Sequence, residues 1–169
     1  MSHKTLESVQ PRLTKTAEAN KPTWTDQEVW GIIAEARGWI DVPFRHQGRS
    51  LSGVDCIGIF SCISQKIGRN IPVPNNYTHH PDQKFLISEM ERLFDRMEKS
   101  ELAPGDLVLL RFPDDQKRVP TRHVAMITDL GLLHASATFR KVTEHTLDDE
   151  WLAKIEHCFR MRRVKPNHE

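Results

Sequence analysis

The sequence contains no run of about 18 apolar residues, so it predicts no membrane-spanning helix. Its first 20 residues are polar and lack the apolar stretch of a signal peptide. Charge of either sign is not in excess, because 24 Lys and Arg balance 23 Asp and Glu to a net charge of +1. This balance gives no electrostatic reason to expect nucleic acid or an anionic membrane as a partner. We therefore expect a protein made in the cytoplasm, which reaches any other compartment without a signal peptide.

Cysteine is also scarce, and its number and spacing argue against disulfides. The chain has three cysteines with no close pair, which does not fit a disulfide framework. We expect Cys62 and Cys158 to be small buried hydrophobic residues, as most free cysteines are. The adjacent residues His79 and His80 have no CxxC, HExxH or comparable ligand spacing around them. The sequence therefore predicts no metal site and no cofactor.

A chain of 169 residues is long enough for one domain with a substantial hydrophobic core. Residues 1–22 are polar with little apolar periodicity, and we expect a flexible arm there, followed by a single domain over residues 23–169. A capping-box pattern at Thr25–Glu28 predicts the start of a first helix that stops near Gly38. Apolar periodicity predicts two more helices, at about residues 56–67 and 82–98.

The periodicity then changes from that of helices to that of strands. Apolar segments between turn residues predict strands at about 107–110, 123–128, 132–135, 139–142 and 158–161, with a short helix at 146–155. His145 is predicted to be a surface residue. Helices followed by an antiparallel meander indicate an α+β fold, with the N-terminal helices packed on an antiparallel β-sheet.

Cys56 is the strongest candidate for a functional residue. It lies in a glycine-flanked turn, Gly53-Val54-Asp55-Cys56-Ile57-Gly58, that opens the second predicted helix. The N-terminus of a helix and a nearby imidazolium both stabilise a thiolate and lower the pKa of a cysteine. His123 and His134 follow in two successive predicted strands. A cysteine, then a histidine base, then a polar orienting residue is the layout of a cysteine hydrolase.

The register between the two histidine strands stays open at this point. A direct pairing of His123 with His134 centres the hairpin turn at Thr128 and Asp129, whereas Gly131 favours a turn further along the chain. A β-bulge would reconcile the two possibilities.

Five segments in order resemble the NlpC/P60 family, which are papain-like cysteine peptidases that cut bacterial cell-wall peptides. The segments are Trp-Ile-Asp-Val-Pro-Phe-Arg-His-Gln-Gly at 39–48, Asp-Cys-Ile-Gly at 55–58, Pro-Gly-Asp at 104–106, His-Val-Ala-Met-Ile at 123–127 and Leu-His-Ala at 133–135. The resemblance covers about residues 26–163. The Arg-His-Gln-Gly variant is most similar to the subgroup encoded by tailed phages, prophages and gene transfer agents.

This resemblance implies a papain-like NlpC/P60 catalytic domain with a Cys-His-His triad. Cys56 would be the nucleophile, His123 the general base and His134 the residue that orients the base. The backbone N–H of Cys56, at the start of its helix, would be one donor to the oxyanion.

The resemblance also implies that Phe44, His46, Gln47 and Asp55 contact the substrate. Phe44 stands where the family usually has a tyrosine, whose hydroxyl lies close to the nucleophile and the oxyanion. A phenylalanine has no donor, and His46 or Gln47 could supply one in its place.

The implied function is a thiol amidohydrolase that cuts peptidoglycan stem peptides, at the bond between D-γ-glutamate and diaminopimelate or lysine. A phage-tail-like particle would bring it to the cell wall or periplasm, with phage-tail proteins as partners. Two alternatives stay open. One is a non-catalytic component of tail-tip assembly, and the other is a papain-like acyltransferase that acts on another amide or ester.

Overall fold

The computed structural model describes residues 24–69, 71, 73, 77, 83–112 and 121–162. The predicted flexible arm at 1–22 and the pair His79–His80 lie outside these residues. In the part of the chain that is described, no helix has both the length and the apolar character needed to cross a bilayer.

The helices in the described residues are α1 (Asp26–Arg37), α2 (Gly58–Lys66), α3 (Gln83–Leu93) and α4 (Asp149–Lys154), with one 3-10 turn, η1 (Lys99–Glu101). Helix α1 begins and ends as predicted. The Thr25 hydroxyl accepts a hydrogen bond from the Glu28 N–H at 3.2 Å, and the Glu28 carboxylate accepts one from the Thr25 N–H at 2.8 Å. This reciprocal capping box satisfies two donors at the helix start, and Gly38 forms the C-cap.

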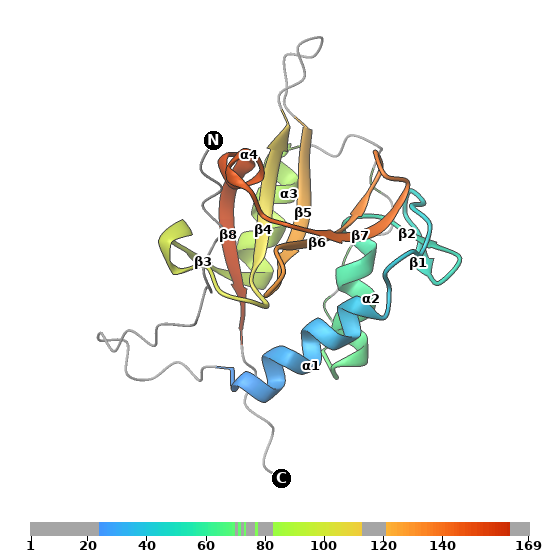
Figure 1. The fold of residues 1–169 in the computed structure, drawn as a ribbon, viewed down its shortest axis with the longest axis horizontal. Coiled ribbons are helices and arrows are strands. Elements are labelled where there is room, and N and C mark those ends of the chain that lie inside the picture. The colour runs from blue at the N-terminus through green and yellow to red at the C-terminus, as the bar shows by residue number, and fades with distance from the viewer. Residues whose placement is uncertain are drawn as a thin grey trace.

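The strands are β1 (Arg49–Ser50), β2 (Gly53–Val54), β3 (Phe94–Met97), β4 (Leu107–Phe112), β5 (Thr121–Ile127), β6 (Leu132–Ser136), β7 (Lys141–His145) and β8 (Ile155–Met161). Strands β1 and β2 form a small separate hairpin. The other six form one sheet in the order β3-β8-β4-β5-β6-β7, and every neighbouring pair is antiparallel (Figure 1). The predicted α+β fold is confirmed.

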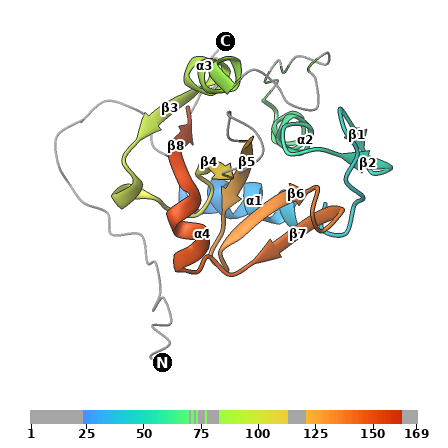
Figure 2. The same cartoon turned by 90° about the horizontal axis from the view of Figure 1, so that it is seen from above.

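The sheet separates two hydrophobic clusters. Figure 2 shows α2 and α3 on one side of the sheet and α4 on the other. On one face, Ile33 of α1, Ile59 of α2 and Leu86 of α3 pack with alternate residues of the central strands. On the other face, Trp151 of α4 packs against a smaller cluster that includes Ala125 of β5. Successive residues of a strand point to opposite faces, so Val124 and Met126 of β5 belong to the first cluster and Ala125 and Ile127 to the second.

The structure corrects the boundaries of the second and third predicted helices. Helix α2 begins at Gly58, so Cys56 lies in the turn before the helix and not within its first turn. Helix α3 ends at Leu93, and residues 94–97 form β3 where a helix was predicted. Strand β3 pairs with β8 along its whole length, and this cross-strand pairing outweighs the helical periodicity of the local sequence.

The last hairpin also differs from the prediction. The strand predicted at 139–142 is β7 at Lys141–His145, and residues 137–140 form the turn before it. His145 is therefore the last residue of a paired strand and is partly buried, where a surface residue was predicted.

The register of β5 and β6 is set by a turn at residues 128–131. Met126 pairs with Leu133 and Ile127 with Leu132, while the Thr128 N–H donates to the Gly131 carbonyl at 2.9 Å. Continuing this register places His134 opposite Ala125, two residues from His123. His123 and His134 are thus diagonal neighbours on one face of the sheet, within reach of long side chains. No direct pairing and no bulge is needed.

Candidate active site

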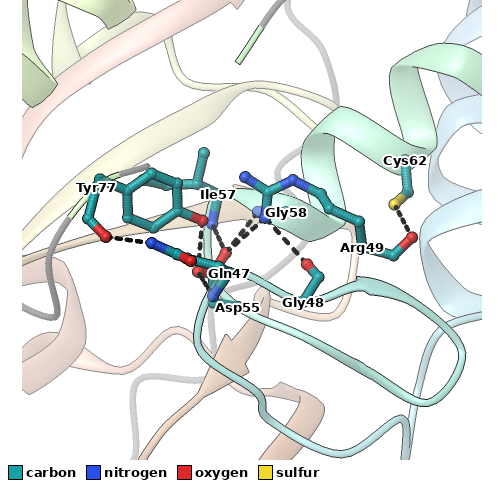
Figure 3. Close-up of polar contacts among 8 residues, drawn as sticks. All are labelled: Gln47, Gly48, Arg49, Asp55, Ile57, Gly58, Cys62 and Tyr77. Atoms are coloured by element: carbon teal, nitrogen blue, oxygen red, sulfur yellow. Dashed lines mark hydrogen bonds and ion pairs between the residues drawn. The ribbon is translucent and has the colours of Figure 1, made fainter. Parts of the chain in front are cut away.

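Asp55 organises the start of α2 (Figure 3). Its side chain is buried, and one oxygen, Oδ1, accepts hydrogen bonds from the N–H groups of Ile57 at 3.2 Å and Gly58 at 2.7 Å. These are donors that a helix N-terminus leaves without partners inside the helix. The other oxygen, Oδ2, accepts from the Gln47 N–H at 2.7 Å and from the Tyr77 hydroxyl at 2.5 Å. Asp55 therefore fixes the residue that follows it, Cys56, relative to α2 and to the loop before β1.

Gly58 allows the loop before β1 to approach α2 closely. A Cβ at position 58 would lie 2.2 Å from the Gly48 carbonyl oxygen and 2.3 Å from the Arg49 guanidinium. Arg49 also reaches the Asp55 carboxylate at 3.3 Å, and its carbonyl accepts a contact from the Cys62 thiol at 3.4 Å (Figure 3). The glycine in the Asp-Cys-Ile-Gly segment is thus required by packing.

Cys56 sits in the turn between Asp55 and α2, partly exposed as a residue. Burial of the thiol raises its pKa to about 12, and the negative charge of Asp55 adds to the rise. Hydrogen bonding from the backbone N–H groups of Val124 and of Cys56 itself acts in the opposite direction. Burial outweighs the helix N-terminus here, so the lowered pKa expected from the sequence is not found. The thiol is protonated at neutral pH.

His123 and His134 are brought together as predicted. The His123 Nε2 atom lies 2.8 Å from the His134 Nδ1 atom. His134 is only 1% exposed, and burial lowers its pKa to about 2, with the neighbouring His123 and His145 adding to the effect. Burial also lowers the pKa of His123 to about 4, although the Asp55 charge raises it. Both rings are therefore neutral at neutral pH.

The structure also brings Cys56 against β5, at the residue that follows His123. The Cys56 sulfur is hydrogen-bonded by the N–H of Val124, the residue that follows His123 on β5. The charge of Asp55 acts on the pKa of both Cys56 and His123. The ladder between β5 and β6 covers only residues 126–127 of β5, so the His123 end of the strand is not paired with β6.

A third histidine, His145, joins this arrangement and was missed in the sequence. Its Nε2 atom lies 2.9 Å from the His134 Nε2 atom, and its Nδ1 atom lies 3.0 Å from the Thr146 carbonyl oxygen. His123, His134 and His145 are each separated by 11 residues and lie on the adjacent strands β5, β6 and β7. This repeated spacing across two hairpins was the available signal, but it needed the correct bounds of β7.

Comparison with known proteins connects this geometry to a family. The family described as NlpC/P60 matches residues 41–161, well over half of the chain. The chain belongs to the NlpC/P60 family. The matched range includes Cys56, His123, His134 and His145.

Two kinds of relatives agree with this assignment. The chain is 25% identical over 135 residues to a probable endopeptidase NlpC of Escherichia coli strain K12, covering 79% of this chain and 77% of that protein. The NlpC/P60 domain of the peptidoglycan hydrolase SagA superposes with a TM-score of 0.56 at 24% identity, covering 79% of this chain and 98% of that chain. An NlpC/P60-family protein of Staphylococcus aureus, described as similar to a lipoprotein, superposes with a TM-score of 0.61 at 17% identity. The match covers 88% of this chain and 46% of that chain. The structural likenesses show that the fold is that of NlpC/P60 domains.

In this NlpC/P60 domain, the residues predicted to contact substrate lie in or beside the loop that Asp55 holds. Phe44 is partly buried against the core. Gln47 donates from its side chain to the Tyr77 carbonyl at 2.5 Å, and the His46 ring lies edge-on to the Tyr77 ring at 5.6 Å. Asp55 is buried, with both oxygens accepting hydrogen bonds from the protein.

Tyr77 is the second residue that sequence reasoning missed. Its phenol hydroxyl donates to Asp55, the residue before Cys56. Phe44, at the position where the family usually has a tyrosine, has no hydroxyl. Burial and the hydrogen bond to Asp55 both raise the pKa of Tyr77, so the hydroxyl stays protonated. Its segment shows no periodicity and no motif, so the sequence carried no signal for it.

An apolar groove, partly open to solvent, lies beside the candidate site of the domain. Its walls include Ile57, Phe60, Tyr77, Met90 and Val124. Ile57 follows Cys56 and Val124 follows His123, so the groove reaches the positions next to both. Among the described residues, no group of three or more His, Cys, Asp or Glu side chains is placed to hold a metal ion.

Proposed function

We propose that the protein is a cysteine peptidase that cleaves peptidoglycan stem peptides. The observation that carries this proposal is that the row of imidazoles begins at His123, next to the residue of β5 whose backbone acts on the Cys56 thiol, in a chain of the NlpC/P60 family. Relatives of this chain are described as a probable endopeptidase and as a peptidoglycan hydrolase, which supports an amide in the cell wall as the target.

In the proposed reaction, Cys56 is the nucleophile, His123 the general base and His134 the orienting residue. His123 takes the thiol proton as the sulfur attacks the carbonyl carbon of the scissile amide. The backbone N–H of Cys56 stabilises the oxyanion of the tetrahedral intermediate. The His123 imidazolium then gives its proton to the leaving amine, and a thioester remains on Cys56. His123 next deprotonates a water molecule, which hydrolyses the thioester and releases the acid and the thiol.

The resting state follows from the pKa values of the two groups. The pKa of Cys56 is raised to about 12 and that of His123 is lowered to about 4, so the free protein holds a neutral thiol and a neutral imidazole. The proton therefore moves during attack, when bound substrate supplies the electrophile, and not before it. Catalysis in this scheme depends on a correctly oriented neutral His123.

The proposed bond is the one between D-γ-glutamate and diaminopimelate or lysine, and the proposed setting is a phage-tail-like particle that acts at the cell wall or periplasm. The support for the setting is the Arg-His-Gln-Gly variant at residues 45–48. Purified particles probed with an antibody against this protein test the setting. Absence of the protein from the particles would contradict it.

Incubation of synthetic stem peptides with purified protein tests the activity. We expect the wild type to cut a peptide containing diaminopimelate or lysine, Cys56→Ala and Cys56→Ser to leave it intact, and Cys62→Ala to cut like the wild type. Mass spectrometry of the products locates the bond. Cleavage by Cys56→Ala would show that the nucleophile is wrong, and no cleavage by the wild type would favour the non-catalytic alternative. An amide product formed with an added amine acceptor would indicate acyl transfer.

A further inference from the structure

The three histidine rings form a chain of contacts that ends on a backbone carbonyl. His123 Nε2 meets His134 Nδ1 at 2.8 Å, His134 Nε2 meets His145 Nε2 at 2.9 Å, and His145 Nδ1 meets the Thr146 carbonyl oxygen at 3.0 Å. A carbonyl oxygen can only accept a hydrogen bond, whereas a neutral imidazole has one donor and one acceptor nitrogen. The direction of the whole chain is therefore set at its carbonyl end.

When all three rings are neutral, counting protons along the chain gives one tautomer for each ring. His145 Nδ1 must carry the proton that it donates to Thr146, so His145 Nε2 is an acceptor. His134 must then donate from Nε2, which leaves its Nδ1 as an acceptor. His123 must in turn donate from Nε2, so its Nδ1 is the unprotonated nitrogen.

The surroundings hold this direction in place. His134 is 1% exposed, so exchange of its partners for bulk water requires local opening. The Trp151 ring of α4 packs on His145 at 4.4 Å and on His134 at 5.6 Å between ring centres. The His134 imidazole is thus buried between the sheet and α4, and the partly buried His145 is the contact that supplies an acceptor to it.

We propose that His145 is a positioning residue that fixes the tautomer of the base through His134. Its contact with the Thr146 carbonyl leaves the His123 Nδ1 atom as the free base, which is the ring nitrogen not engaged by His134. When His123 takes a proton, the acceptor nitrogen of His134 already points at its Nε2–H. No second proton needs to move. The catalytic consequence rests on the proposed function, whereas the tautomers themselves do not.

Nitrogen-15 labelling of histidine tests the tautomers directly, because long-range proton–nitrogen spectra distinguish the two neutral forms of each ring. For the wild type at neutral pH we expect protons on Nε2 of His123, Nε2 of His134 and Nδ1 of His145. A proton on Nδ1 of His123 in the resting protein would overturn the proposal, whether or not the protein cuts stem peptides.

Substitutions at position 145 then test the role in catalysis. His145→Gln keeps an oxygen acceptor for His134 and should retain the wild-type tautomers and most of kcat. His145→Phe removes the acceptor, so His134 and His123 should become tautomer mixtures and kcat should fall about tenfold or more with little change in KM. His157→Phe is the matched control, because His157 lies on β8 outside the row and contacts Arg96.

The outcomes separate the two proposals. Unchanged tautomers and unchanged kcat in His145→Phe would overturn the role of His145, even if the wild type is an active peptidase. The expected tautomers in a protein that cuts no stem peptide would retain the role of His145 in setting the tautomers and refute the proposed function. If His145→Phe does not fold, the wild-type and His145→Gln spectra still decide the question.

Discussion

The Tyr77 hydroxyl donates to the Oδ2 atom of Asp55 at 2.5 Å, across 22 positions of the sequence. This contact ties the residue before Cys56 to a segment between α2 and α3. Tyr77→Phe removes the donor and leaves a buried carboxylate oxygen with one partner fewer. We expect the free energy of unfolding to fall by about 1.5–3 kcal/mol, the usual range for a hydrogen bond to a charged group. Urea unfolding measures the loss, and a change below about 0.5 kcal/mol would contradict it.

The reactivity of Cys56 should show the raised pKa of its thiol. Since the thiolate is the reactive form and the pKa is about 12, alkylation of Cys56 should rise about tenfold per pH unit from neutral to alkaline pH without a plateau. The Cys62→Ala Cys158→Ala double variant leaves Cys56 as the single thiol for this measurement. A plateau near neutral pH would instead indicate a stable thiolate–imidazolium pair.

Asp55→Asn in the same background checks the cause of the shift. The negative charge of Asp55 is the second contribution to the raised pKa of Cys56, after burial. Its removal should lower that pKa and speed alkylation of the folded protein at a given pH. An equal or slower rate would show that the charge of Asp55 does not act on the thiol.

Gly58→Ala tests the close packing between α2 and the loop before β1. The added methyl group would meet backbone atoms of Gly48, which cannot rotate away, so we expect a loss of about 1–3 kcal/mol in the free energy of unfolding. Gly31→Ala in α1 is the matched control. Nothing lies within 4 Å of a Cβ at that position, so the same change should stabilise by about 0.5–1 kcal/mol. Equal effects at the two glycines would contradict the packing argument.

Arg160 and Asp106 form a bidentate pair in which both bonds are 2.7 Å and Asp106 is buried. Arg160→Met removes the cation that pairs with the buried Asp106 carboxylate. The free energy of unfolding should therefore fall by about 2–3 kcal/mol. We expect a loss no larger than this because Arg160 is half exposed. The double variant with Asp106→Asn should recover part of this loss. Lys141→Met is the control, since the exposed pair of Lys141 with Asp41 should contribute less than about 1 kcal/mol. Additive losses in the double variant would rule out coupling of the two side chains.

Stability should fall in acid because of the buried histidines. The pKa of His123 is lowered to about 4 and that of His134 to about 2 from 6.5, so below pH 6.5 these groups bind protons in the unfolded chain but not in the folded one. The free energy of unfolding should therefore decrease as pH falls from about 6.5 toward 4, by about 1.4 kcal/mol per pH unit for each histidine. His134→Gln should reduce this slope by about 1.4 kcal/mol per pH unit, the contribution of one histidine. An unchanged slope in that variant would contradict the assignment.

The parts of the fold that the sequence predicted are those with a local chemical signal. The capping box at Thr25 and Glu28, the turn with Gly131 and the order of helices and strands all follow from short-range patterns. Residues 94–97 have helical periodicity but form β3, because their pairing with β8 depends on a segment more than 50 positions away. Local propensity cannot report such a contact.

The residues of the candidate site were likewise predicted only in part from the sequence. Cys56, His123 and His134 were predicted from segment order and family resemblance; the structure brings the rings of His123 and His134 into contact, and the triad as a whole stays a prediction. His145 was assigned to the surface because the last hairpin was placed about two residues too early. The raised pKa of Cys56 also could not be predicted, since its main cause is burial of the thiol in the folded chain, where the backbone of the distant residue Val124 lies against it.

The equal spacing of His123, His134 and His145 makes loop length a part of the site. The lengths of the turns at 128–131 and 137–140 determine which face of the sheet each histidine occupies. One inserted or deleted residue would turn the side chains of the next strand to the opposite face. A histidine would then leave the row with every catalytic side chain still present in the sequence. Insertions in this domain should therefore be tolerated in other loops and excluded from these two turns, even where no turn residue contacts substrate.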